Sequence, residues 1–301
     1  NIVPKIRICF WTTPNAIQVD SFAADGDLTL EAWVLPQKVE SMTRVLHHAR
    51  SATGYTLGLQ QANHESALSF NGNSYIELES AETLNLTNNS FTVEAWVKLT
   101  DTQDAALPIL GMDLESDDRT NKVLHLIVRD RKVYLGFYGN DTQTQTSLDN
   151  NHWYHLAWRY DKDAETQTIF IDGEKAASNT EKPPFLGTGT VYIGKYWAGT
   201  FQGAIDEVRI WNYPLTQAQI NADRNHRLKG DEGGLTAYWQ FLNGEALDRS
   251  GHGHNGAINV SLSQVESPPI DYAVFTGVGN QFARSTDAFF TNQWAHLSVL
   301  Y

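Results

Sequence analysis

The chain has 301 residues, of which 41% are hydrophobic and 19% are charged, a composition that is ordinary for a globular protein of about two domains. Acidic residues outnumber basic residues by 35 to 22, and the resulting net charge of −13 argues against nucleic acid as a partner, because it would repel a phosphate backbone. No apolar run reaches the roughly 18–20 residues that a membrane helix needs, so we expect no membrane insertion.

The first part of the chain contains three strand patterns. Residues 28–34, Leu-Thr-Leu-Glu-Ala-Trp-Val, place apolar side chains at every second position, which predicts a strand with one buried face. Residues 45–48 and 55–59 predict two further strands around a Ser-Ala-Thr-Gly turn. No signal segment follows Asn1, and the one cysteine, Cys9, cannot form an internal disulfide. We expect the chain to be a piece of a longer polypeptide.

The pattern of short strands separated by turns restarts at Ala67 and continues nearly to the end. It predicts strands over residues 67–70, 75–78, 91–97, 109–112, 123–128, 133–138, 153–160, 168–171, 174–177, 191–195, 202–211, 235–241 and 257–260. The turn Asp172-Gly173 between two of these strands is a strong hairpin signal. So many short strands indicate an all-β fold, an antiparallel β-sandwich of the jelly-roll type.

One short helix is expected among these strands. Thr216 and Gln219 have the spacing of a capping box, and Leu215 with Ile220 has that of a hydrophobic staple. These signals predict a helix over about residues 217–227 that covers one end of the sandwich.

Two sequence motifs occur twice. Residues 91–97, Phe-Thr-Val-Glu-Ala-Trp-Val, repeat residues 28–34, and the Trp-x-His-Leu segment of residues 153–160 recurs at 294–301. Each of two domains would therefore have an early Glu-Ala-Trp-Val strand and a late Trp-x-His-Leu strand. The repeats indicate two related domains.

The order of the motifs suggests that one domain is inserted into the other. The outer, incomplete domain would comprise residues 1–66 plus 267–301, and the inserted, complete domain would comprise residues 67–266. This arrangement predicts that strand 55–59 pairs antiparallel with strand 272–276. Three tandem domains, cut at both ends, are the alternative.

Residues 201–220, Phe-Gln-Gly-Ala-Ile-Asp-Glu-Val-Arg-Ile-Trp-Asn-Tyr-Pro-Leu-Thr-Gln-Ala-Gln-Ile, resemble the closing signature of laminin-G-like, concanavalin A-like lectin/glucanase jelly-roll domains. The Phe70-Asn71-Gly72 opening, the Ile-Asp-Gly hairpin at 171–173 and the tail from Asp248 to Gly256 are similar to further features of that family. The resemblance covers essentially all of residues 67–266. The outer domain lacks the Ile-Asp-Glu-Val segment.

The resemblance implies two facing antiparallel sheets and a mainly binding function. Members of the family are typically extracellular modules that recognise glycans or proteins, some of them with calcium. We therefore expect a non-catalytic module of a larger extracellular or cell-surface protein, with a glycan or an extracellular protein as its ligand. A structural or assembly domain of a large surface protein or toxin is the alternative, because fold alone does not decide function.

A glycoside hydrolase-like activity is the third hypothesis. Glucanases of this architecture carry Glu-x-Asp-x-(x)-Glu on one strand, so that paired carboxylates serve as nucleophile and acid. The nearest segment here, residues 204–207, lacks the leading glutamate, and the acidic residues of 161–165 indicate a turn. We expect no enzymatic activity.

The histidines of the chain offer weak metal signals. His155 and His296 lie on the duplicated strands, where a hydrogen-bonded structural histidine is the simpler interpretation. His252 and His254 flank Gly253 in a turn, but two histidines are too few for an ordinary zinc site.

Calcium is a more plausible metal than zinc, because the segments that resemble the family contain residues with oxygen ligands. Asn71, Asp206, Asp248 and Asn255 lie in those segments, and calcium prefers such ligands. The opening and closing strands of a jelly roll tend to be adjacent, which would bring the four together. The alternative is that Asp248 and Asn255 only shape a turn through side-chain to backbone hydrogen bonds.

A loop with aromatic side chains is the predicted ligand-binding site. Lys195, Tyr196 and Trp197 lie between two predicted strands, where an exposed indole could stack on a sugar ring beside polar groups. The alternative is that Trp197 folds down onto the end of the sandwich.

Overall fold

The computed structural model divides into two compact units, Asn1–Asn63 with Pro269–Tyr301 and His64–Pro268. The structure describes the backbone of residues 29–34, 43–47, 55–61, 65–100, 106–114, 117–268, 270, 272–278, 281–289 and 295–300. It describes the side chains of Leu57, residues 67–100, 106–114 and 117–268, and Ile270. Cys9 and the side chain of His296 lie outside the described residues. Helices long and apolar enough to cross a membrane are absent from the described part of the chain.

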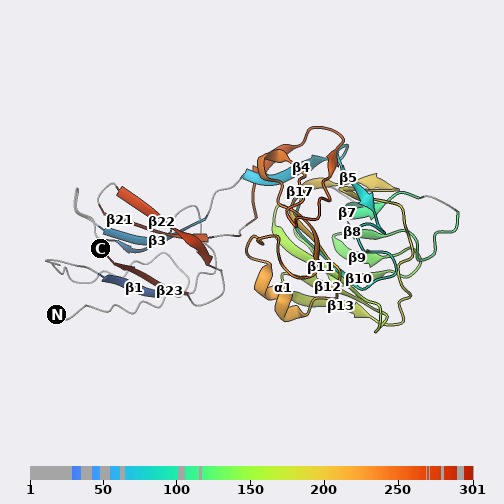
Figure 1. Cartoon of the computed structure of the whole chain (residues 1–301), viewed down its shortest axis with the longest axis horizontal. Coiled ribbons are helices and arrows are strands. Elements are labelled where there is room, and N and C mark those ends of the chain that lie inside the picture. Colours follow the sequence, from blue (N-terminus) through green and yellow to red (C-terminus); the bar gives the residue numbers. More distant parts are fainter. Residues whose placement is uncertain are drawn as a thin grey trace. The chain divides into compact units, whose positions relative to one another are not determined.

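The larger unit contains an eight-stranded antiparallel sheet with the order β13-β12-β11-β6-β17-β4-β20, in which β18 also pairs with β17 (Figure 1). Its strands are β4 (Glu65–Asn71), β6 (Phe91–Leu99), β11 (Trp153–Asp161), β12 (Thr166–Ile171), β13 (Glu174–Asn179), β17 (Gln202–Trp211), β18 (Leu235–Trp239) and β20 (Ser263–Glu266). The opening strand β4 is thus adjacent to the closing strand β17, as a jelly roll requires.

A seven-stranded sheet with the order β10-β9-β8-β7-β14-β5-β19 forms the second layer. Its strands are β5 (Ile76–Ser80), β7 (Leu107–Met112), β8 (His125–Arg129), β9 (Lys132–Gly136), β10 (Thr142–Ser147), β14 (Thr190–Ile193) and β19 (Ala257–Ile258). The predicted all-β jelly-roll sandwich is confirmed. Strands β10 and β20 were not predicted from the sequence.

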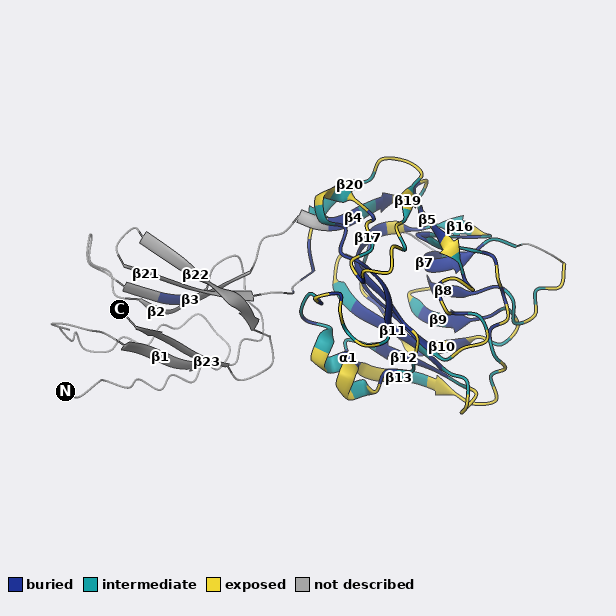
Figure 2. Cartoon of the chain, viewed as in Figure 1, coloured by how far each residue is buried: buried dark blue, intermediate teal, exposed yellow. Residues whose placement is uncertain are grey.

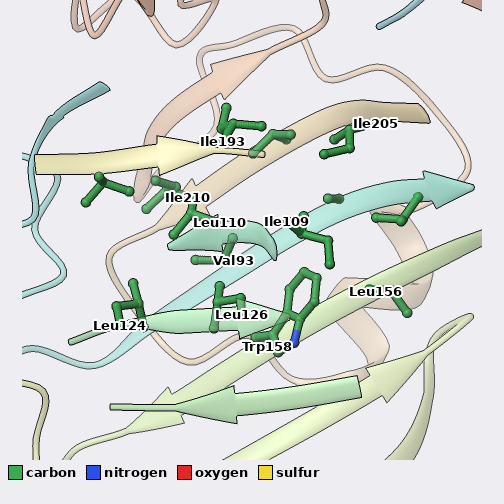
Figure 3. Packing of buried hydrophobic residues seen from close by; sticks show 14 of the residues in the cluster. Val93, Ile109, Leu110, Leu124, Leu126, Leu156, Trp158, Ile193, Ile205 and Ile210 are labelled. Carbon is green, nitrogen blue, oxygen red and sulfur yellow. The ribbon is translucent and has the colours of Figure 1, made fainter. Parts of the chain in front are cut away.

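The apolar core lies between these two sheets (Figure 3). Phe91, Val93, Ala95 and Val97 of β6 all belong to this cluster and are fully buried, so the alternation in the duplicated motif correctly predicts the inner face of the strand. Leu110 and Leu126 of the facing sheet pack into the same cluster. This core fixes the sandwich on which every candidate site is built.

The short helix α1 spans Gln217–Asp223 and has the predicted capping box between Thr216 and Gln219. Leu215 and Ile220 are both buried. The helix is shorter than predicted, ending at Asp223, and it does not cover an end of the sandwich. Instead, Leu215 and Ile220 pack in a second apolar cluster with residues of β11, β12, β17 and β18.

The helix α1 and the loop after it cover the outer face of the strands beneath them, so these strands are buried on both faces (Figure 2). The outward-facing Thr92, Glu94 and Trp96 of β6 are as buried as the apolar residues between them. The Trp96 indole N–H donates to the backbone oxygen of Arg224, just beyond the helix, at 2.8 Å. The alternation of apolar residues therefore identifies the inner face of β6 but not its outer face, which is buried as well.

The smaller unit contains the pair β1 (Thr29–Val34) and β23 (Ala295–Leu300) and a sheet with the order β2-β3-β21-β22. The latter comprises β2 (Thr43–His47), β3 (Tyr55–Gln61), β21 (Tyr272–Val278) and β22 (Gln281–Phe289). β3 pairs antiparallel with β21, with Leu57 opposite Thr276, which is the pairing that the repeat analysis predicts.

The duplicated motifs pair in the same register in both units. Trp33 lies opposite His296 across β1 and β23, and Trp96 lies opposite His155 across β6 and β11. The same strand pair is thus built twice from the same motifs. That the smaller unit is a second, incomplete jelly-roll domain with the larger unit inserted into it stays a prediction.

Candidate functional site

A tight hairpin, β15 (Lys195–Tyr196) and β16 (Gly199–Thr200), folds onto strand β7. The backbone N–H of Trp197 donates to the carbonyl oxygen of Met112 at 3.1 Å. A side chain at Gly111 would prevent this approach, since a Cβ there would lie 2.7 Å from the Tyr196 Cβ and 2.9 Å from the Lys195 carbonyl oxygen. Gly111 therefore lets the hairpin carry Trp197 onto the sheet.

Trp197 lies in a group of rings contributed by three segments. Its ring centroid lies 5.2 Å from that of His125 and 5.7 Å from that of Tyr138. His125 alternates with the core residues Leu124 and Leu126, so it faces away from the sandwich core. Trp197 and Tyr138 are both half-buried, and both pack against the edge of the apolar core.

Polar groups border these rings. His125 Nε2 lies 3.1 Å from Asp141 Oδ1, and His125 Nδ1 lies 3.1 Å from the Val123 carbonyl oxygen. The pair sits over Gly136, where a Cβ would lie 2.2 Å from His125 Nε2. Burial favours a raised pKa for Asp141, but the hydrogen bond with His125 and the nearby charges of Arg129 and Lys182 together lower that pKa, so this carboxylate is charged at neutral pH.

We call the group His125, Tyr138, Asp141 and Trp197 the Trp197 patch. Arg119 extends it, because its guanidinium lies 5.8 Å from the Tyr138 ring and its Nη1 lies 3.4 Å from the Tyr138 hydroxyl. The patch combines half-exposed aromatic rings with a carboxylate and a cation. This arrangement can bind a polar ligand that has an apolar face.

Of the three residues predicted to bind ligand, Trp197 is the half-buried residue whose ring belongs to the patch. Tyr196 is 4% exposed, its ring centroid is 4.4 Å from that of Trp197, and it supports that residue. The Lys195 amine donates to Asp113 at 2.5 Å and lies 4.1 Å from the Tyr192 ring. Burial favours a lower pKa for Lys195, but the hydrogen bond with Asp113 and the charge of Asp113, with Tyr192 and Tyr75, together raise it.

Sequence analysis missed His125, Tyr138 and Asp141. His125 lies on β8, Tyr138 just after β9 and Asp141 just before β10, all far from Trp197 in the chain, and no local pattern marks them as functional. The alternation of polar His125 with apolar neighbours was the one available signal.

The residues predicted to hold calcium lie in separate places. Asn71 pairs with Gln202 across β4 and β17, and Asp206 lies four residues farther along β17, about 13 Å at the rise of a strand. Asn71 Oδ1 accepts from the Asn73 backbone N–H at 3.0 Å, and Asp206 is fully buried. Asp248 and Asn255 do lie together, since Asn255 Oδ1 accepts from the Asp248 backbone N–H at 2.9 Å.

The Asp248 carboxylate already accepts five hydrogen bonds. Oδ1 accepts from the backbone N–H groups of Tyr238 and Ser250 at 3.0 and 2.8 Å. Oδ2 accepts from the Ser250 hydroxyl and the backbone N–H groups of Gly253 and His254 at 2.8, 2.9 and 3.0 Å. Partial burial favours a raised pKa, but these donors, beginning with Ser250 N–H, lower it.

Asp248 and Asn255 therefore organise the turn, as the simpler hypothesis expects. The four residues do not present one cluster of oxygen ligands in this arrangement. Among the described residues, no group of three His, Cys, Asp or Glu side chains could hold a metal ion. Calcium binding by the chain stays a prediction.

The carboxylates considered for catalysis have structural surroundings. Asp206 and Glu207 are 0% and 1% exposed. Glu207 accepts hydrogen bonds from Arg209 and Arg227 at 2.9 and 3.3 Å and from the Tyr238 hydroxyl. A substrate could reach neither carboxylate without opening the protein.

The histidines likewise have structural surroundings. His155 is 1% exposed, and its Nε2 lies 3.6 Å from Glu94 Oε1. His252 Nδ1 lies 3.0 Å from the Thr236 carbonyl oxygen, and His254 Nδ1 is paired with Glu79.

Solved structures with a similar fold include a "putative carbohydrate binding protein from Bacteroides ovatus", which is 22% identical with a TM-score of 0.53. That match covers 67% of this chain and 60% of the other, so this chain spans less than two thirds of that protein's length. No curated protein matches this chain.

Two further solved structures match with lower TM-scores. Domain 4 of AbnA, a GH43 extracellular arabinanase from Geobacillus stearothermophilus, in complex with arabinotriose, is 19% identical over 61% of this chain and 98% of that chain, with a TM-score of 0.43. The Ruminococcus gnavus IT-sialidase CBM40 is 16% identical over 52% of this chain and 95% of that chain, with a TM-score of 0.44.

A model of the Laminin_G_3 family, described as the concanavalin A-like lectin/glucanases superfamily, matches residues 70–221. This segment holds 152 of the 301 residues, just over half of the chain, and contains β5 to β17 and most of α1. The protein belongs to the concanavalin A-like lectin/glucanase superfamily.

Proposed function

We propose that the protein is a non-catalytic carbohydrate-binding module that binds a glycan at the Trp197 patch. The observation that carries this proposal is the half-exposed indole of Trp197, held against His125 and Tyr138. The apolar face of a sugar ring can stack on such a surface, while Asp141 accepts hydrogen bonds from hydroxyl groups.

The rigidity of the patch supports binding. Trp197 is anchored by its backbone N–H, which donates to the Met112 carbonyl oxygen, and the Tyr196 ring packs against the Trp197 ring. His125 and Asp141 hold each other, so little conformational entropy is lost when a ligand docks. The similar fold of the Bacteroides ovatus protein, described as carbohydrate binding, agrees with the proposal.

The proposal includes the absence of catalysis, because the acidic residues closest to a glucanase motif, Asp206 and Glu207, are buried and bonded within the protein. We also propose that the protein acts outside the cell or at the cell surface, where glycans are presented. Calcium has no part in the proposed binding surface.

The test is a glycan array followed by calorimetric titration with the best ligand. The variant Trp197→Ala should weaken binding by roughly tenfold or more, since aromatic stacking contributes about 1–3 kcal/mol. Trp153→Ala is a matched control, because Trp153 is also half-buried but lies under Lys98, 5.1 Å from its amine. Equal binding by wild type and Trp197→Ala would contradict the assignment, and so would an array without any bound glycan.

A further inference from the structure

The loop of residues 137–141, between β9 and β10, carries two of the four residues of the Trp197 patch. Tyr138 and Asp141 come from this loop. His125 lies on β8, and Trp197 lies in the turn between β15 and β16. The patch therefore exists only while the loop holds its half against the other half. The groups that hold the loop are as necessary to the patch as its rings.

The loop has a backbone conformation that its own sequence does not favour. Tyr138 has φ +75°, in the left-handed region that bulky side chains rarely adopt, and Gly139 has φ +84°. A bulky residue keeps such a conformation only where the surrounding contacts impose it. Contacts beyond the local backbone are therefore needed to keep the Tyr138 ring centroid 5.7 Å from that of Trp197.

The side-chain amide of Asn140 makes the first of these contacts. Its Oδ1 accepts from the backbone N–H of the core residue Phe137 at 3.1 Å, which closes the turn around Tyr138 and Gly139. Its Nδ2 donates to Asn121 Oδ1 at 2.6 Å. The Asn121 backbone N–H in turn donates to the Tyr138 carbonyl oxygen at 3.2 Å. Asn140 thus joins the loop to the core and to the segment before β8.

Lys182 holds the same loop from a distant part of the chain. Its Nζ donates to the carbonyl oxygens of Asn140 and Asp141 at 2.9 and 3.1 Å. Lys182 is itself fixed, since its backbone N–H donates to the Glu165 carbonyl oxygen at 2.9 Å and its carbonyl oxygen accepts from the Tyr160 hydroxyl at 3.0 Å. The two bonds from Nζ go to backbone oxygens, so they act on the position of the loop rather than on the Asp141 carboxylate.

We propose that Asn140 and Lys182 are positioning residues, which hold the 137–141 loop in the geometry with which the Trp197 patch binds a glycan. This inference rests on the proposed function and adds that the affinity depends on two side chains that bond to the loop and not to the sugar. Because the loop is held in advance, the sugar does not have to order it, which lowers the entropic cost of binding.

The first experiment compares glycan affinities by calorimetric titration of the whole chain. The probe is the array oligosaccharide that binds the wild type most tightly. Asn140→Leu keeps the approximate volume of the side chain without its hydrogen bonds, and Lys182→Met keeps the aliphatic stem without the ammonium. Each should weaken binding about three- to tenfold. Asn140→Asp should recover part of the loss, because it keeps the acceptor for the Phe137 N–H.

Asn221→Leu is the matched control. Asn221 is also half-buried, and its Nδ2 donates to the Gly173 carbonyl oxygen at 3.2 Å, but it lies on α1, which packs on the other sheet. It should leave the affinity unchanged. All titrations are made well below the melting temperature of each variant, so that a loss of affinity is not a loss of folded protein.

NMR of the ligand-free chain gives a second readout, which a purely stabilising role would not move. The Tyr138 ring protons lie near the Trp197 ring and carry a ring-current shift that depends on this placement. Asn140→Leu and Lys182→Met should move these signals toward those of an exposed tyrosine, whereas Asn221→Leu should not. Unchanged Tyr138 signals in both loop variants would overturn the proposal.

The failure of this proposal can be told apart from the failure of the proposed function. If Trp197→Ala leaves the affinity unchanged, the glycan binds elsewhere, and both the proposed site and the positioning role are overturned. If Trp197→Ala weakens binding but Asn140→Leu and Lys182→Met do not, the site stands and the positioning role alone is overturned.

Discussion

The eight-stranded sheet buries both of its faces at strands β6 and β17, but by different chemistry. On the inner face, Val93 of β6 and Ile210 of β17 pack among apolar side chains (Figure 3). On the outer face, the adjacent residues Glu94 and Arg209 are also fully buried, beneath α1 and the loop after it. The stability of the inner layer depends on the volume and shape of its apolar side chains. The stability of the outer layer depends on each charged group keeping its particular partners.

Arg209 is the centre of the outer layer. Its Nη2 donates to Glu207 Oε2 at 2.9 Å and to the His226 carbonyl oxygen at 2.7 Å, and its Nη1 donates to the Asp223 carbonyl oxygen at 2.9 Å. A β-bulge in β17 orients the side chains of Glu207 and Arg209. The register of β17 shifts between Asp206 and Arg209, and Glu207 has φ +52°. The guanidinium thereby ties the end of α1 to the sheet.

The largest expected effect comes from Arg209→Met, which leaves the buried Glu207 without its closest cation. We expect the free energy of unfolding to fall by about 3–5 kcal/mol, measured by urea denaturation with tryptophan fluorescence. The double variant Arg209→Met with Glu207→Gln should recover part of this loss, because the Glu207 charge is then no longer stranded. A loss below about 1 kcal/mol in the single variant would show that the outer layer behaves like ordinary apolar packing.

A pH-dependent effect of intermediate size is expected from Glu94. Burial raises the pKa of Glu94 from 4.5 to about 7 in the folded protein, although the Trp211 indole N–H donates to its Oε2 at 2.7 Å. Between these pH values the folded state binds more protons than the unfolded state. This carboxyl therefore makes the free energy of unfolding fall as pH rises from 4.5 to 7, by at most about 3 kcal/mol.

The variant Glu94→Gln isolates this contribution, because Gln keeps an acceptor for Trp211 and does not titrate. His155 acts in the opposite direction, since burial lowers its pKa well below 6.5 and its contribution is lost as pH falls. Because His155 Nε2 lies 3.6 Å from Glu94 Oε1, the two proteins are compared across pH 4.5 to 7 in a His155→Asn background, in which residue 155 does not titrate. Parallel stability curves for the two proteins would refute a raised Glu94 pKa.

The smallest effect should come from the inner face. Ile210→Val removes one buried methylene next to Arg209 in the chain and should cost about 0.5–1.5 kcal/mol, with no dependence on pH. The same denaturation series measures it. If Ile210→Val cost as much as Arg209→Met, the contrast between the two faces would be lost.

Local patterns in the sequence were sufficient for the inner face and the helix start. Alternation placed Phe91, Val93, Ala95 and Val97 correctly in the core, and the Thr216–Gln219 capping box located the first turn of α1. The same approach failed for β10, whose sequence Thr-Gln-Thr-Gln-Thr-Ser contains no apolar side chain. Thr142 and Thr144 of this strand are buried, and their hydroxyls accept hydrogen bonds from Asn179 and Val133. Sequence spacing does not identify these partners.

By itself, the sequence determined the class of fold and the duplicated strand motifs, because strand alternation and helix caps depend on residues close together in the chain. The family followed from the resemblance of its motifs to those of a known family. Tertiary structure decided the candidate sites, because their members come from distant segments. Trp197 meets His125 only after a hairpin folds over Gly111. Such contacts depend on how the strands are ordered within each sheet, which no local spacing encodes.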